Sequence, residues 1–434
     1  MLYLFIALCL LFSMIKRFLF SLLVLVMLGS QVWASEVLIP MDNSQKNHLK
    51  AYGLAYWVLT RQVEVDWLLN FKGGSFAFKH SPALENEMVV RGISYSIISD
   101  AQYNDILAQI SNPDANMDIM KLEKVPKIAV YSPKTKQPWD DAVTLVLTYA
   151  EIPYDVIFDE EIMDNSLPKY DWLHLHHEDF TGQYGKFYVH YRNYPWYRAQ
   201  QQEAETIARK YGFEKVSQLK LGVAKRMKEF IAGGGFMFAM CTATDTYDIA
   251  LAAEGVDIAD VMFDGDGVDP QAQQKLDFNK TLAFKDFKLV RNPYDAEFSN
   301  IDNQMLERNI PQNNDFFQLF TFSAKWDPVP TMLTQNHEKT IRGFMGQTTG
   351  FKKNLIKPEI ILMGETKAAN EVRYMHGTLG KGTWTFYGGH DPEDYQHLVD
   401  EEPTDLTLHP NSPGYRLILN NILFPAAKKK KQKT

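Results

Sequence analysis

Near the middle of the chain lies the stretch Ala232-Gly-Gly-Gly-Phe-Met-Phe-Ala-Met-Cys241-Thr-Ala-Thr-Asp245. Its glycines are followed by the apolar run Phe236 to Met240, which is typical of a short buried strand. A helical pattern begins near Tyr247, so the cysteine falls where a strand gives way to a helix. The stretch therefore predicts a strand–turn–helix unit with Cys241 at the turn.

Cys241 at this turn is a candidate nucleophile. A nucleophile in a sharp, strained turn needs small neighbours two residues away on each side, and Ala239 and Ala243 occupy those positions. The start of a helix lowers a thiol pKa, and backbone N–H groups near Gly234 and Thr242 are the predicted donors to a reacting oxygen. The alternative is a packed core cysteine, because free cysteine is among the most often buried residues.

A candidate general base follows another predicted strand, Thr383 to Tyr387. His390 comes just after this strand, and Asp391 and Glu393 follow it closely. In a parallel sheet the carboxyl ends of the strands meet at one edge, which would bring His390 to Cys241. A Cys–His pair oriented by a carboxylate is suited to acyl transfer, and the orienting role is open between Asp391 and Glu393. The alternative for His390 is a turn residue that is hydrogen-bonded to one of these carboxylates.

Strand-like and helix-like stretches alternate on both sides of these motifs. Examples are the predicted strands at 37–40 and 128–131, each followed by a helical stretch. Such alternation predicts an α/β protein with a parallel sheet that is flanked by helices. We therefore expect a small N-terminal α/β unit at 35–124 and a larger domain at 125–427. Between about 260 and 355 the periodicity fades, which predicts an irregular insertion.

The first 34 residues form a separate segment. A basic pair at 16–17 precedes the apolar run 18–28, and Val32-Trp-Ala34 suits a cleavage site. This pattern predicts a secretory signal peptide and a periplasmic or extracellular protein with no integral membrane anchor after cleavage. The alternative is a single membrane anchor from residue 2 to 28.

Composition narrows the class of protein further. The chain of 434 residues has 45 Lys and Arg against 53 Asp and Glu, a formal net charge of −8. Such an acidic chain is not expected to bind nucleic acid, because phosphate neutralisation needs clustered basic residues. The lysine-rich end, 428–434, is predicted to be a disordered tail. Of the 2 cysteines, Cys9 would leave with the signal peptide, so stability must come from a core rather than from disulfides. No cofactor is predicted.

A further group of chemically active side chains lies in the stretch Asp171-Trp-Leu-His-Leu-His-His-Glu-Asp179. On a strand, His174 and His176 project from one face, and His177 and Glu178 enter the following loop. Three interpretations stay open for this group. His174, His176 and Glu178 hold a zinc-like ion, the group lines a metal-free pocket beside the cysteine, or the histidines are structural.

The motifs around Cys241 and His390 together resemble the class I glutamine amidotransferase-like superfamily, and more closely its trehalose-utilisation (ThuA-like) branch. The resemblance lies in Gly233 to Asp245, in a strand that ends at His390, and in a closing helix from Tyr415 to Leu423. It implies a flavodoxin-like parallel sheet. The chain departs from the ThuA-like branch in carrying a cysteine at the turn, where members usually have a histidine.

The whole chain also resembles secreted proteins that carry the label asparagine synthetase B. That label implies glutamine-dependent asparagine synthesis, but the chain has no Ser-Gly-Gly-x-Asp-Ser loop, and its mature form is predicted to start near Ser35 rather than at a cysteine.

From the predicted signal peptide and the Cys241–His390 pair, we predict a secreted hydrolase of an amide or peptide-like bond, with a small-molecule, peptide or carbohydrate substrate. The alternatives are a non-catalytic ThuA-like module that binds a carbohydrate or a protein partner, and a metal-dependent hydrolase.

Overall fold

The computed structural model describes residues 14, 16, 35–135, 137–303, 308 and 310–428. The predicted signal peptide and basic tail lie outside these residues, apart from Met14, Lys16 and Lys428, so both stay predictions. Within the described part of the chain, none of the helices is both long enough and apolar enough to span a membrane.

The N-terminal part folds around an antiparallel sheet. Its strands are β1 (Ser35–Ile39), β2 (Val65–Leu69), β3 (Ser75–Lys79), β4 (Ser96–Ser99) and β5 (Asp118–Leu122). Its helices are α2 (His48–Thr60), α3 (Pro82–Arg91) and α4 (Asp100–Ser111). The strand order is β4-β1-β3-β2-β5, and each neighbouring pair is antiparallel. The expectation of a parallel sheet is therefore wrong here: β1 and β2 flank α2 as predicted, but β3 inserts between them.

A tight turn between β2 and β3 explains this arrangement. Asn70, Gly73 and Gly74 adopt positive φ values of 61°, 75° and 89°. A Cβ at Gly73 would lie 2.2 Å from the carbonyl oxygen of Met41, so the position requires glycine. The chain reverses direction at this turn, and β3 pairs with β2 as a hairpin.

A second sheet is built from the rest of the described chain, and it is mixed. Its parallel strands are β6 (Ile128–Tyr131), β7 (Asp155–Ile157), β8 (Trp172–Leu175), β9 (Phe236–Met240) and β15 (Gly382–Tyr387). Its antiparallel strands are β10 (Phe316–Leu319), β11 (Thr340–Arg342), β12 (Phe351–Lys352), β13 (Ile361–Thr366) and β14 (Glu371–Leu379). The order is β11-β10-β13-β14-β15-β9-β8-β6-β7, with β12 paired to β14. The predicted flavodoxin-like parallel sheet is therefore wrong for this chain.

The antiparallel half arises where the sequence pattern is weakest. β14 and β15 form a hairpin whose turn contains Gly380 at a φ of 61°. A Cβ on Gly380 would lie 2.5 Å from the carbonyl oxygen of Ala232. The segment at 260–355, expected to be irregular, contributes β10, β11 and β12 to the sheet. It also carries the short helices α11 (Val261–Asp264), α12 (Ala272–Lys275) and α14 (Pro328–Leu333).

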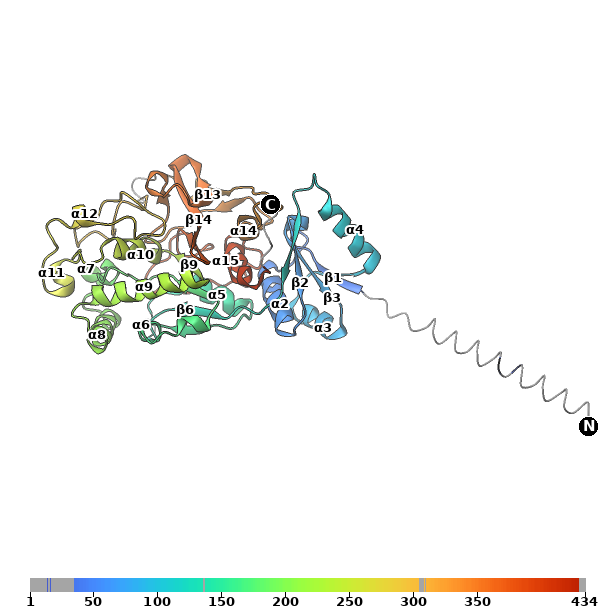
Figure 1. Ribbon diagram of the computed structural model, residues 1–434, viewed down its shortest axis with the longest axis horizontal. Helices are drawn as coiled ribbons and strands as arrows, with labels where there is room; N and C mark the ends of the chain where they lie inside the picture. Colours follow the sequence, from blue (N-terminus) through green and yellow to red (C-terminus); the bar gives the residue numbers. More distant parts are fainter. Residues whose placement is uncertain are drawn as a thin grey trace, which may run out of the picture.

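Helices cover both faces of the parallel strands. They are α5 (Ala142–Tyr149), α6 (Asp159–Met163), α7 (Tyr188–Tyr191), α8 (Pro195–Lys210), α9 (Val216–Gly233), α10 (Thr242–Ala252) and α15 (Pro413–Leu423). Along β6, Ile128 and Val130 pack into the apolar cluster of α5 and α15, while Ala129 and Tyr131 pack into that of α9 and α10. In Figure 1, α15 lies beside α2, where the N-terminal sheet meets the mixed sheet.

Candidate active site

Cys241, His390 and His176 come together at the carboxyl ends of neighbouring parallel strands. Cys241 follows β9, His176 follows β8, and His390 comes just after β15. The order β15-β9-β8 places these strand ends side by side. The rings of His176 and His390 lie 4.7 Å apart between centroids. The parallel half of the sheet is thus sufficient to assemble the predicted pair.

The backbone of Cys241 is strained. Its φ of 46° and ψ of −137° are values that L-residues rarely adopt, and the residue caps the start of α10. Its N–H donates to the carbonyl of Gly389 over 3.2 Å, and the residue is 3% exposed. Ala239 and Ala243 are fully buried on either side of it. Strain of this kind costs about 1–3 kcal/mol and is typical of functional turns.

Relief of this strain gives a stability test. Cys241→Gly and Cys241→Ala both remove the thiol, but only glycine adopts a positive φ without a steric cost. We expect the glycine variant to exceed the alanine variant by about 1 kcal/mol in the free energy of unfolding. Urea titration of the two proteins measures this difference, and an alanine variant of equal or greater stability would contradict a strained turn.

Cys241 and His390 shift each other's pKa values in opposite directions. Burial raises the pKa of the Cys241 thiol, but the hydrogen bond and charge of His390 and the N–H of Thr348 outweigh it, so the pKa is lowered overall. Burial lowers the pKa of His390, but hydrogen bonds to Asp140 and Cys241 and their charges raise it to about 10. His390 is therefore protonated at neutral pH, and the thiol of Cys241 is more acidic than an ordinary cysteine thiol.

Asp140 contacts the ring of His390. The Nε2 of His390 lies 3.5 Å from Oδ1 of Asp140, and the Nε2 of His397 lies 2.9 Å from the same oxygen. The rings of His390 and His397 stack with their centroids 4.5 Å apart. Burial raises the pKa of Asp140, but its contacts with these two imidazoles lower it overall. Asp140 is therefore an ionised carboxylate that two imidazoles share.

The carboxylates predicted to orient His390 bond elsewhere. Oε2 of Glu393 lies 3.1 Å from Nδ1 of His409, and Oδ1 of Asp391 accepts the N–H of Glu393. Among the described contacts, neither carboxylate bonds to the ring of His390. Sequence reasoning missed Asp140 because 250 positions separate it from His390. The one sequence feature that could have indicated Asp140 is its place in the loop after β6, a strand that neighbours β8.

Asp140→Asn tests whether Asp140, rather than one of the predicted carboxylates, orients His390. The substitution removes the negative charge that stabilises the imidazolium, so the pKa of His390 falls and the thiolate is less populated. We expect the rate constant for iodoacetamide alkylation of Cys241 at pH 7 to fall by about tenfold. In the matched control Glu393→Gln, the rate should stay within about twofold of the parent. Equal slowing in both variants would remove Asp140 from the orienting role.

The candidate metal ligands do not converge as predicted. Nε2 of His174 and Nδ1 of His176 lie 3.0 Å and 3.2 Å from Oδ2 of Asp141. Glu178 instead accepts the backbone N–H of His176 at 2.9 Å, and it belongs to none of the groups of close ligating atoms in the described chain. The carboxylate of Asp141 is hydrogen-bonded to His174 and lies close to His176, whose two ring nitrogens have no hydrogen-bond partner in the described structure.

His176 and His177 are neutral rings beside the Cys–His pair. Burial lowers the pKa of His176 to about 4 and that of His177 well below its usual range. Nε2 of His177 lies 2.8 Å from the carbonyl oxygen of Asp140, and its ring centroid is 4.7 Å from that of His390. His177 lines the same cavity as Cys241. Of the three interpretations left open for this stretch, pocket lining fits the position of His177 best.

The predicted oxyanion donors lie at opposite edges of the sheet. Thr242 is the first residue of α10 and lines the same cavity as Cys241. Gly234 follows α9, and its N–H donates to the carbonyl of Ile231. The whole of β9 separates Gly234 from Cys241, and a strand of that length spans about 16 Å. Gly234 is therefore too far away to contact a substrate at the thiol, and its prediction as a donor is wrong.

The loop at 345–349, which precedes β12, lies against Cys241. The backbone N–H of Thr348 contributes to the lowered pKa of the thiol, and the carbonyl of Met345 accepts the N–H of His390 at 2.8 Å. A Cβ at Gly346 would lie 3.1 Å from the thiol sulfur, so glycine permits this close approach. Sequence reasoning missed this loop because its residues match no catalytic motif.

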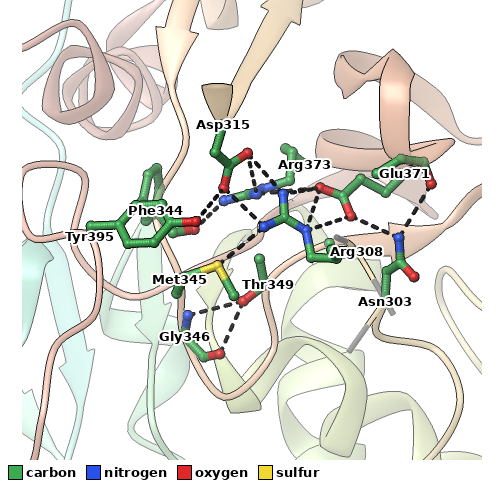
Figure 2. A network of polar contacts seen from close by, with 12 residues as sticks. Asn303, Arg308, Asp315, Phe344, Met345, Gly346, Thr349, Glu371, Arg373 and Tyr395 are labelled. Atoms are coloured by element: carbon green, nitrogen blue, oxygen red, sulfur yellow. Dashed lines mark hydrogen bonds and ion pairs between the residues drawn. The ribbon is translucent and has the colours of Figure 1, made fainter. Parts of the chain in front are cut away.

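A buried ion network anchors the same loop, as Figure 2 shows. Arg308 donates to both carboxylate oxygens of Asp315 at 2.9 and 2.8 Å, and its Nε donates to Glu371. Arg373 lies 3.4 Å from Oε1 of Glu371 and donates to the carbonyl of Phe344. The network therefore holds Phe344 in place. Phe344 directly precedes Met345, whose carbonyl accepts the N–H of His390.

A cavity of about 220 Å³ opens onto the Cys–His pair. The residues around it include Trp139, His177, Cys241, Thr242, Gln347 and His390. Such a mixture of apolar walls and a few convergent polar groups is typical of small-molecule sites. The volume suits a small acyl group or a single side chain.

Comparison with known proteins identifies no family. No protein-family model matches the chain, and no curated protein matches it. Among solved structures, two cytoplasmic proteins from Salmonella typhimurium, one of them from strain LT2, align with 70% of this chain and 100% of their own. Their sequence identities are 9% and 11%, and their TM-scores are 0.34 and 0.33. A beta-galactosidase from Bacillus circulans sp. alkalophilus aligns over 62% of this chain and 29% of its own, with 12% identity and a TM-score of 0.27. TM-scores this low give no basis for a shared fold or activity.

Proposed function

We propose that the protein hydrolyses an amide or peptide-like bond through the thiolate of Cys241. The observation that carries this proposal is the coupling of Cys241 and His390: the pKa of the thiol is lowered, and that of the adjoining His390 is raised to about 10. A thiolate at a strained strand–helix turn is the form that attacks a carbonyl carbon. The adjoining cavity gives a substrate room to reach it.

In the proposed reaction, the sulfur of Cys241 forms a bond to the carbonyl carbon, and an electron pair moves onto the carbonyl oxygen. The N–H of Thr242, at the start of α10 next to the thiol, is the proposed donor that stabilises that oxygen. The C–N bond then breaks as His390 gives its proton to the departing nitrogen. Water, deprotonated by His390, attacks the thioester and releases a carboxylic acid and the thiolate.

Asp140 and His397 act on this chemistry through His390. The carboxylate of Asp140 stabilises the imidazolium and holds the ring toward the thiol. His397 shares that carboxylate, and its Nδ1 lies 3.0 Å from Oδ2 of Asp394, which fixes its own ring. Asp140 and His397 are therefore positioning residues, because neither contacts the reacting atoms.

A panel of amides and peptides with chemically varied side chains tests the proposal. Release of amine should be detectable for at least one member and should fall by about 10³-fold or more in Cys241→Ala. A chelator should leave the rate unchanged. Hydrolysis that survives in Cys241→Ala but stops with the chelator would favour a metal-dependent hydrolase instead. Formation of asparagine from glutamine, aspartate and ATP would favour the synthetase label.

A further inference from the structure

A second cavity adjoins the one that contains Cys241. It has a volume of about 70 Å³, and Trp139, His177 and Phe187 line both cavities. That volume is enough for about five water-sized atoms. The smaller cavity therefore suits one end of a substrate whose reactive carbonyl lies at the thiol.

The charged side chains around the smaller cavity are mostly acidic. Glu178, Asp179 and Glu203 line it, together with Lys220. The ammonium of Lys220 already bonds to both carboxylate oxygens of Asp159, at 2.9 and 3.0 Å, so its charge is balanced within that pair. His177 carries no charge at neutral pH because burial lowers its pKa well below its usual range. The titratable groups left to interact with a ligand's charge are therefore carboxyl groups.

Two of the acidic groups would be stabilised by a nearby cation. Oε2 of Glu203 is buried and has no hydrogen-bond partner in the described structure. Glu178 accepts the N–H of His176 through Oε2, and burial raises its pKa to about 7. Asp179 differs, because it already accepts hydrogen bonds from the backbone or hydroxyl groups of Thr181 and its neighbours. A positive charge near Glu203 and Glu178 would offset the cost of their burial.

Aromatic rings complete the walls. Tyr184 joins Trp139 and Phe187 in the lining, and the last two rings lie 5.3 Å apart between centroids. The faces of such rings attract cations, most strongly for tryptophan. Carboxylates and aromatic rings around a small space are suited to an ammonium or guanidinium group, and they are unsuited to an anion.

We propose that this cavity binds a positively charged group of the substrate, an alkylammonium or guanidinium, while the scissile carbonyl lies at Cys241. The substrate class is then an amide or peptide with a basic side chain or a free amine next to the bond that is cleaved. This proposal rests on the proposed hydrolysis for its orientation, but the cation site itself does not depend on catalysis.

The first experiment measures binding without turnover. In the Cys241→Ala protein, n-butylammonium should bind, and the neutral n-butanol should bind at least about tenfold more weakly by calorimetric titration. Glu203→Gln in the same background should weaken n-butylammonium binding by about tenfold. The control is Glu205→Gln, on the same helix, whose side chain is 42% exposed and pairs with Arg209; it should change binding less than about twofold. Equal binding of the amine and the alcohol, or equal effects of the two variants, would overturn the proposal.

The second experiment measures turnover with amides that carry a lysine, norleucine or glutamate side chain. The lysine amide should exceed the norleucine amide in kcat/KM by at least about tenfold, and Glu203→Gln should remove most of that preference. Hydrolysis without any preference for lysine would overturn the cation site and leave the hydrolase proposal intact. Selective n-butylammonium binding with no hydrolysis of any amide would support the cation site and contradict the hydrolase.

Discussion

Glu371→Gln is expected to lower the free energy of unfolding by about 3–5 kcal/mol. Glu371 is fully buried between Arg308 and Arg373, so the substitution leaves both guanidinium groups facing Asp315 without their second carboxylate. Burial raises the pKa of Glu371, but Arg308 and Arg373 outweigh it and lower the pKa overall. Its contribution is therefore present above the unfolded pKa of about 4.3 and is lost as the pH falls through the lower folded value.

Glu365→Gln is the matched control for this prediction. Glu365 lies on β13, next to the strand that carries Glu371, and pairs with Lys353 at 2.7 Å. The two side chains are 19% and 41% exposed, so the loss should stay below about 1 kcal/mol. Chemical denaturation at pH 7 measures both variants. Similar losses in the two would show that the buried network does not stabilise the fold.

His390→Ala is expected to slow iodoacetamide alkylation of Cys241 at pH 7 by about 10- to 100-fold. His390 supplies the hydrogen bond and the positive charge that lower the thiol pKa, and burial raises that pKa once the imidazole is gone. The rate should recover as the pH is raised, because more of the thiol then ionises. Mass spectrometry of the alkylated protein gives the rate constant at each pH.

His409→Ala is the control for this second prediction. His409 follows the same strand as His390, but it pairs with Glu393 and its side chain is 36% exposed. Its loss should leave the alkylation rate within about twofold of the parent protein. If both variants react as fast as the parent, the thiol is not activated by His390.

Local features of the site could be predicted from the sequence, because they depend on residues close together in the chain. The glycines before Phe236 and the small residues around Cys241 specify a strand that ends in a sharp turn, and Cys241 has a φ of 46° there. The position of His390 after a strand follows in the same way. Their meeting needs only that β9 and β15 be parallel neighbours, which they are.

Strand direction and long-range partners could not be predicted in this way. Alternating strands and helices fit a parallel sheet, but they fit equally well the N-terminal arrangement in which β3 inserts between β1 and β2. In the mixed sheet, the hairpin at Gly380 sets the direction of β14, and periodicity does not report it. Asp140 contacts His390 across 250 positions, so it could be found only once the loop after β6 had been placed against His390.

The central claim, a thiolate–imidazolium pair at neutral pH, is tested most directly by the protonation state of His390. Nitrogen-15 NMR of histidine-labelled protein reports each imidazole, and His390→Gln assigns the signal among the 11 histidines. The account predicts that His390 stays protonated up to a pKa of about 10 and that this pKa falls in Cys241→Ala. A His390 ring that titrates near 6.5, the ordinary value for histidine, and that does not respond to Cys241→Ala would contradict it.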